Sequence, residues 1–150
     1  MESSRFLVLP TRLMHDHVES LKEGTKADAY KYVVYSAHDD SVLNMLRFFN
    51  VDFDWIPFAS TFTIELKYSQ KCVKANKDNM DGCIGVSVLN NNVPLRFPET
   101  CTGDYFTLNG CKWAEFNTLV TENWYSGPDS DDLDKACFQK PKGTQKPVTE

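Results

Sequence analysis

The sequence lacks the features of several large classes of protein. Its 150 residues carry a formal net charge of -5 and contain no cluster of Lys and Arg. Because nucleic-acid binding draws most of its affinity from clustered basic side chains, we expect no nucleic-acid partner. The longest apolar runs, Phe6–Leu9 and Tyr32–Tyr35, are far shorter than the roughly 20 residues that cross a bilayer, so we expect no membrane span.

The N-terminus does not have the pattern of a signal peptide. Glu2 and Arg5 precede an apolar stretch that ends at Pro10, whereas a signal core has roughly 7 to 15 apolar residues. The sequence also contains no Asn-x-Ser/Thr acceptor for N-glycosylation. These absences give no support for export of this chain by itself.

The cysteines, in contrast, are typical of a secreted protein. All five lie in polar, loop-like contexts after position 70, as disulfides of secreted domains usually do. No Cys-x-x-Cys pair occurs and no histidine lies near them, so we expect no metal site. The two sets of observations agree if this chain is the C-terminal part of a secreted protein whose earlier half carries the signal. The cysteines are Cys72, Cys83, Cys101, Cys111 and Cys137.

Hydrophobic periodicity predicts a helix, a strand and a second helix in the first third of the chain. The first helix runs from a capping Thr11 to a stop at Gly24. Residues 32–35 form a continuous run of β-forming side chains, typical of a strand buried on both faces of a parallel sheet. A second helix follows, with Asp40 or Ser41 as its cap. The apolar positions behind these predictions are Met14, Val18 and Leu21, then Val42, Met45, Leu46 and Phe49.

The middle of the chain has the period-two alternation of half-exposed strands, which predicts an antiparallel set. Beyond Ser126 the sequence is too polar to offset its ordering entropy by burial, so we expect residues 127–150 to be a weakly ordered tail. The expected elements are a strand over 61–69, a hairpin loop over 74–82, a strand over 84–88, a short strand over 93–97 and a helix over 112–121.

Tyr35 to Asp39 lie where the predicted strand ends and the next helix begins. In an α/β sheet this corner binds ligands, and the free N–H groups of the helix favour an anion such as phosphate. His38 can donate a hydrogen bond to a phosphoryl oxygen, and a protonated Asp39 can give its proton to a leaving alcohol. The plainer interpretation is a helix cap beside a solvated imidazole.

The run Tyr35-Ser36-Ala37-His38-Asp39 resembles the Tyr-Ser-Ala-His-Asp motif of the histidine acid phosphatases, including the apolar strand before it. Pro57 to Ser60 and the following Glu65-Leu66 are similar to that family's Pro-Tyr-Ala-Ser and Glu-Leu strand. The resemblance covers roughly residues 10 to 137. It implies an α/β fold, the C-terminal portion of a phosphoglycerate-mutase-like sandwich, in which residues 1–126 supply one buried parallel strand flanked by helices and then antiparallel strands.

By this resemblance Asp39 is the proton donor and His38 binds the phosphate of a phosphate monoester, with no cofactor or metal. The family attacks phosphorus with the histidine of an Arg-His-Gly-x-Arg-x-Pro motif, which this sequence lacks. We therefore expect the isolated chain to be inactive and the parent to be a secreted or lysosomal acid phosphatase. The alternative is a non-catalytic remnant or a disulfide-stapled binding module, in which the His-Asp corner at most holds an anion.

The resemblance also implies a disulfide pattern. The family's cysteines that match Cys101 and Cys111 bond to each other across a short loop, and Cys72 with Cys83 would close the hairpin loop. Cys137 lies where a C-terminal cysteine of the family reaches back to the earlier half of the enzyme. A missing N-terminal half bonded through Cys137 is thus an expected partner, and a free surface thiol is the alternative.

Overall fold

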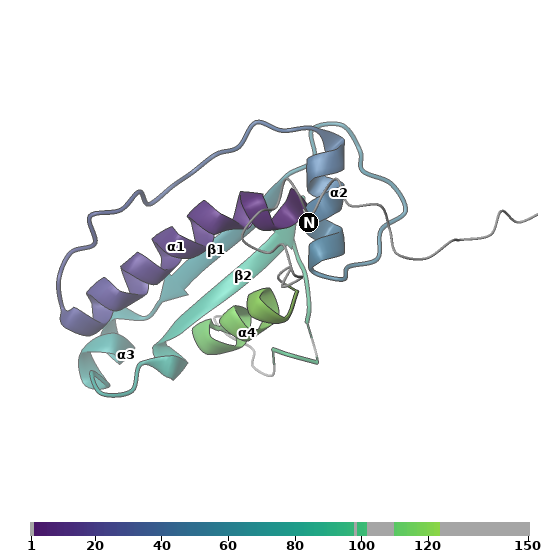
Figure 1. Ribbon diagram of the computed structural model, residues 1–150. Coiled ribbons are helices and arrows are strands. Elements are labelled where there is room, and N and C mark those ends of the chain that lie inside the picture. The colour runs from purple at the N-terminus through teal and green to yellow at the C-terminus, as the bar shows by residue number, and fades with distance from the viewer. Residues whose placement is uncertain (1, 98, 102–109, 124–150) are drawn as a thin grey trace, which may run out of the picture.

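Figure 1 shows the computed structural model of the chain, in which residues 2–97, 99–101 and 110–123 are described. The predicted tail over 127–150 and Cys137 lie outside the described residues. The elements follow in the order α1 (Glu2–Glu23), α2 (Asp39–Phe48), β1 (Phe62–Tyr68), α3 (Gln70–Ala75), the 3-10 turn η1 (Asp81–Cys83), β2 (Ile84–Asn90), β3 (Val93–Pro94), β4 (Cys111–Lys112) and α4 (Trp113–Asn123).

The described strands form one small antiparallel sheet with β2 at its centre. β1 pairs with β2 along its whole length, from Phe62 opposite Asn90 to Tyr68 opposite Ile84. The two-residue strands β3 and β4 pair with the two ends of β2 on its other side. The fold therefore combines helices with a small antiparallel sheet, which is compatible with the predicted α/β class.

The core lies on the face of the sheet that carries Phe62. The rings of Phe49, after α2, and Phe116, from α4, stack with centroids 6.2 Å apart, and Phe97 lies 5.6 Å from Phe49. Every residue of β2 from Ile84 to Leu89 is buried, and this central strand has β1 along one edge and β3 and β4 along the other. Packing of these aromatic rings joins α4 and the end of α2 to the sheet, since Phe49 also stacks on Phe62 of β1.

The first helix begins earlier than the sequence pattern predicts. α1 starts at Glu2 rather than at Thr11, and Pro10 lies inside it. Proline removes one helical hydrogen bond, but Leu7, only 1% exposed, extends the buried stripe of Met14 and Val18 by two turns. Gly24 ends the helix with a φ of +70°, a conformation that glycine adopts without strain.

Residues 32–35 differ most from the prediction. They are not part of any strand of the described sheet, and they are exposed rather than buried. Figure 1 shows the connection between α1 and α2 as a long open trace that runs the length of α1. A strand exists only where a neighbouring strand satisfies its backbone, and the described residues provide no neighbour here. The expected buried parallel strand is therefore absent from this arrangement.

Three smaller predictions are also revised. The loop predicted over 74–82 contains the end of α3 and the start of η1. The helix α3 begins after Ser69, which caps it by accepting a hydrogen bond from the N–H of Cys72. The short strand predicted over 93–97 is limited to Val93 and Pro94. The last helix begins at Trp113, one residue later than predicted.

Candidate functional site: the start of α2 and the adjoining apolar groove

His38 is the N-cap of α2. Its backbone is extended (φ -102°, ψ 172°), and its carbonyl oxygen accepts the N–H groups of Ser41 and Val42 at 3.1 and 3.4 Å. The N-cap thus lies two or three residues before the predicted caps Asp40 and Ser41. The imidazole makes no capping hydrogen bond, so it is available to a ligand at the positive end of the helix dipole.

Asp39 is the first residue of α2. Its carboxylate accepts the N–H of Asp40 at 2.9 Å, and Asp40 accepts the hydroxyl of Ser41 at 3.4 Å. His38, Asp39 and Asp40 are all exposed. The structure therefore brings the predicted His-Asp pair together at a helix N-terminus, with a second carboxylate beside it that opposes anion binding by like-charge repulsion.

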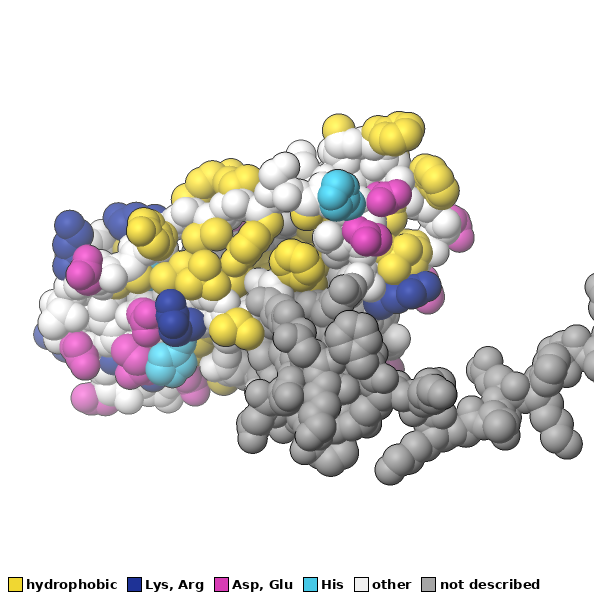
Figure 2. Space-filling model, turned by 45° about the horizontal axis from the view of Figure 1, so that its top comes forward, with side chains coloured by type: hydrophobic (Ala, Val, Ile, Leu, Met, Phe, Trp, Pro, Cys, Tyr) yellow, Lys and Arg dark blue, Asp and Glu magenta, His cyan; other side chains and the backbone are white. Residues whose placement is uncertain are grey.

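An open groove of about 760 Å³ adjoins this helix start, and we call it the apolar groove. Its walls come from α1, from the connecting residues 30–39, from α2, from the loop 55–61 and from β1 as far as Ile64. Figure 2 shows hydrophobic side chains gathered over this face, with histidine and acidic side chains beside them. His38 and Asp39 both line the groove.

Two aromatic residues of the groove were not recognised from the sequence. Trp55 is 75% exposed and Phe58 is 100% exposed, so both rings stand at the rim without covering the core. A loop that contains Pro57 predicts exposure of the backbone, but local sequence does not tell whether an aromatic ring turns inward. Exposed aromatic rings around a groove are typical of a surface that binds another molecule.

The other two histidines do not join the site. His15 lies 3.9 Å from the carboxylate of Glu19 on the surface of α1. The Nε2 atom of His17 lies 3.2 Å from the carbonyl oxygen of Tyr30, so it attaches the connecting segment to α1. His15 and His17 therefore make their contacts at α1, and neither lies at the candidate site around His38.

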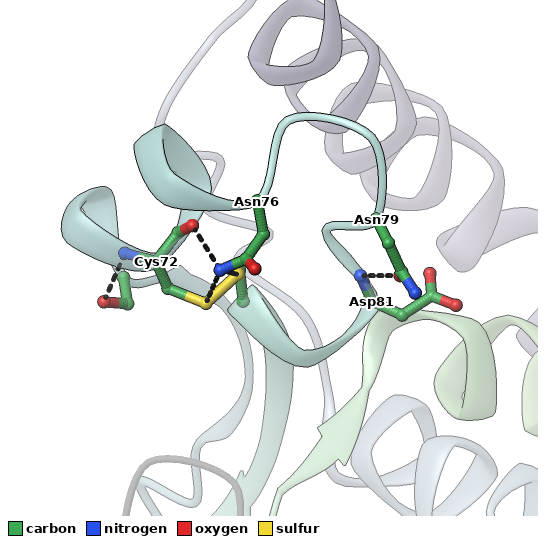
Figure 3. The surroundings of a disulfide bond; sticks show 6 residues. Cys72, Asn76, Asn79 and Asp81 are labelled. Atoms are coloured by element: carbon green, nitrogen blue, oxygen red, sulfur yellow. Dashed lines mark hydrogen bonds between the residues drawn. A yellow bond between two sulfur atoms is a disulfide. The ribbon is translucent and has the colours of Figure 1, made fainter.

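Both disulfides that the sequence suggested are present. Cys72 is bonded to Cys83 and Cys101 to Cys111, with Cα atoms 5.4 and 4.8 Å apart. In Figure 3 the side-chain amide of Asn76 points at the first disulfide, and it donates to the carbonyl oxygen of Cys72 at 3.0 Å. Two disulfides are consistent with a secreted or extracellular protein.

The described residues contain no group of three or more His, Cys, Asp or Glu side chains arranged to hold a metal ion. Across the same residues, no helix has the length and apolar character needed to cross a membrane.

The chain is similar to a protein of known sequence. Counting factor 60 of Dictyostelium discoideum is 30% identical to this chain over 97 residues, which cover 65% of the chain. The chain spans only 18% of the length of that relative. No family model matches the sequence, and no solved structure matches it.

Proposed function

We propose that this chain is the C-terminal segment of a histidine acid phosphatase, in which Asp39 is the proton donor and His38 binds the phosphate. The observation that carries the proposal is the run Tyr35 to Asp39 at the start of α2. Its histidine is the N-cap residue, although the imidazole makes no capping hydrogen bond, and its aspartate is the first helical residue. The N–H group of Asp39 and the positive end of the helix dipole suit a phosphoryl group at this position, although the N–H groups of Asp40 and Ser41 are already used in hydrogen bonds.

The chemistry assigned to these residues is hydrolysis of a phosphate monoester in two steps. A histidine nitrogen supplied from outside residues 1–150 forms a bond to phosphorus while the bond to the ester oxygen breaks. Asp39 gives its proton to the leaving oxygen, which departs as the alcohol. Water then cleaves the phosphohistidine to give inorganic phosphate and free histidine, and Asp39 as carboxylate accepts a proton from that water.

In the complete protein, residues 32–35 would be the last strand of a parallel sheet in a phosphoglycerate-mutase-like sandwich. Their β-forming side chains and their unpaired backbone support this role. The similarity to a much longer relative is in keeping with a segment of a longer protein. A secreted or lysosomal location of that enzyme follows from the same proposal, and the disulfides support it. Cys137 is the residue assigned to a bond with the earlier half.

The first test is hydrolysis of a generic aryl phosphate at acidic pH by this chain and its Asp39→Asn variant at matched concentration. We expect no turnover by either, because the nucleophile is not among residues 1–150. Turnover by the parent chain that falls sharply in the variant would show that Asp39 works with another nucleophile, and the incomplete-site proposal would be wrong.

The second test separates an enzyme segment from a non-catalytic module. The genomic sequence immediately upstream of the codon for Met1 either does or does not encode an in-frame Arg-His-Gly-x-Arg-x-Pro segment. If it does, the extended chain is expected to hydrolyse the aryl phosphate, and Asp39→Asn is expected to lower the rate by about 10²–10⁴-fold, the usual contribution of a general acid. Full activity of the extended chain after the Asp39→Asn substitution refutes the role of Asp39.

A further inference from the structure

The disulfide between Cys72 and Cys83 borders an open pocket between α3, η1 and β4. The pocket has a volume of about 460 Å³, and both cysteines line it. Cys83 is 1% exposed, whereas Cys72 is partly exposed. Because access decides which sulfur of a disulfide is attacked, a thiol from solution reaches the sulfur of Cys72 more easily than that of Cys83.

A side-chain amide faces the same two sulfurs (Figure 3). Nδ2 of Asn76 donates to the carbonyl oxygen of Cys72 at 3.0 Å, and it lies 3.7 Å from Sγ of Cys72 and 4.0 Å from Sγ of Cys83. The amide nitrogen carries two N–H groups, so one is left for sulfur when the other bonds to the carbonyl. A hydrogen bond to a thiolate stabilises its charged form. Asn76 therefore suits a step in which one of these sulfurs leaves as a thiolate.

Ser69 holds the two cysteines near each other independently of the bond between their sulfurs. Its N–H donates to the carbonyl oxygen of Cys83 at 2.9 Å, and its hydroxyl oxygen accepts the N–H of Cys72 at 3.3 Å. Next to these residues, Tyr68 and Ile84 form the last pair of the β1–β2 ladder. Because these backbone attachments remain when the disulfide opens, the two sulfurs stay at a high effective concentration for each other. Opening of this bond is therefore expected to be reversible.

We propose that the Cys72–Cys83 bond is a thiol-exchange site, at which a low-molecular-weight thiol forms a mixed disulfide with Cys72 and releases Cys83. The thiolate of the small molecule attacks Sγ of Cys72, and a new sulfur–sulfur bond forms as the bond to Sγ of Cys83 breaks. The electron pair stays on Cys83, which leaves as a thiolate beside the Asn76 amide. In the return reaction this thiolate attacks Cys72, closes the original bond and releases the small thiol. The inference does not depend on the proposed phosphatase activity.

The bond between Cys101 and Cys111 provides an internal comparison. Its sequence separation is 10 residues, against 11 for Cys72 and Cys83. Loop-closure entropy therefore gives the two bonds nearly the same stability, and a difference in exchange has to come from the surroundings of the sulfurs. Cys111 is 1% exposed in β4, which pairs with the central strand. Attack on Cys101 would release a thiolate there, where burial disfavours charge, so we expect this bond to exchange more slowly.

The test is incubation of the folded chain, without denaturant, with reduced and oxidised glutathione in graded ratios. Acid quenching, alkylation of free thiols and peptide mass spectrometry locate the products. We expect glutathione on Cys72 and a free thiol on Cys83 while Cys101 and Cys111 are still bonded, and closure of the first bond when the glutathione is removed. The same result is expected in Cys137→Ser, which shows that the fifth cysteine is not the attacking thiol.

Two asparagines of the pocket separate the role of the amide from that of the pocket. Asn76→Ala removes the N–H that faces the sulfurs and is expected to slow the opening of Cys72–Cys83 by about 3–10-fold, the effect of one hydrogen bond. Asn79→Ala is the matched control, because Asn79 also lines the pocket but its side-chain oxygen accepts the N–H of Asp81 at 3.3 Å (Figure 3). This control is expected to leave the rate unchanged. Circular dichroism of both variants checks that the fold is retained.

Three outcomes would overturn the proposal. One is that both disulfides open together, or that Cys72–Cys83 opens only in denaturant, since the bond would then be a structural crosslink. Another is an adduct on Cys83 rather than on Cys72, or a bond that does not close again when glutathione is removed. The third is an unchanged rate in Asn76→Ala, or equal slowing by Asn79→Ala.

Discussion

The ring of Phe49 stacks on the ring of Phe62, with centroids 5.7 Å apart and planes 22° from parallel. Phe49 directly follows α2, and Phe62 is the first residue of β1. This contact therefore attaches the helix that begins at Asp39 to the edge of the sheet, and it holds the candidate site and the apolar groove in one arrangement.

Replacement of Phe49 by alanine is expected to lower the free energy of unfolding by about 3–5 kcal/mol, the usual cost of replacing a buried phenylalanine by alanine. The ring is 2% exposed and contacts aromatic side chains on two other elements. Chemical denaturation followed by circular dichroism gives the measurement. Phe58→Ala is the control, because Phe58 is fully exposed and its loss is expected to cost less than about 0.5 kcal/mol. Equal losses in the two variants would contradict the arrangement of the core.

The disulfides close two loops of similar length, with sequence separations of 11 and 10 residues. Chain-entropy arguments give about 2–3 kcal/mol of stabilisation for each loop of this size. We expect Cys72→Ala/Cys83→Ala and Cys101→Ala/Cys111→Ala each to lower the melting temperature.

A reductant tests whether this effect comes from the bonds themselves. It is expected to lower the melting temperature of the parent chain and to have no further effect on a variant that lacks both pairs. If reductant leaves the melting temperature of the parent unchanged, the bonds do not contribute in this way.

The antiparallel part of the fold could be predicted from the sequence, because its two long strands are close together in the chain and apolar residues alternate along each of them. The alternation from Phe62 to Tyr68 is the observed β1, and the pattern that begins at Ile84 is the observed β2. Their pairing across a short disulfide-closed connection brings together residues close in the chain, so no distant segment has to be known.

The conformation of residues 32–35 could not be predicted from local sequence. Their composition predicts a strand, but they form none among the described residues, because a strand depends on a partner that local sequence does not specify. At the candidate site, too, some residues could be predicted from local sequence and others could not. The position of His38 and Asp39 at a helix start follows from the local pattern, whereas the exposed rings of Trp55 and Phe58 depend on how a loop packs.

The Lys22 ammonium donates a hydrogen bond to Glu19 at 2.7 Å, and this bond holds the pKa of that carboxyl below its usual value. Lys22→Ala is therefore expected to raise the pKa of Glu19, as measured by NMR titration of its side-chain carbons, while Lys26→Ala leaves it unchanged. A folded-state pKa below the unfolded one stabilises the fold above the unfolded pKa, and this stabilisation is lost as pH falls through the folded pKa. An unaltered Glu19 titration in Lys22→Ala would contradict the assignment.

Gly110 lies beside the centre of the sheet, immediately before the strand β4 that Cys111 begins. A Cβ atom at this position would lie 2.6 Å from the carbonyl oxygen of Val86 and 3.1 Å from Oγ of Ser87. The first contact is with backbone of the central strand, which cannot turn away, so Gly110→Ala is expected to cost about 1–3 kcal/mol of stability.

The second contact at Gly110 provides a control for the first. Removing the Ser87 hydroxyl relieves only the longer contact, so the alanine penalty measured by chemical denaturation is expected to remain large in a Ser87→Ala background. Full recovery there would mean that the side chain of Ser87 sets the limit and that β2 can shift. No loss in either background would mean that β4 does not lie this close to β2, and the attachment of the Cys101–Cys111 loop to the sheet would have to be revised.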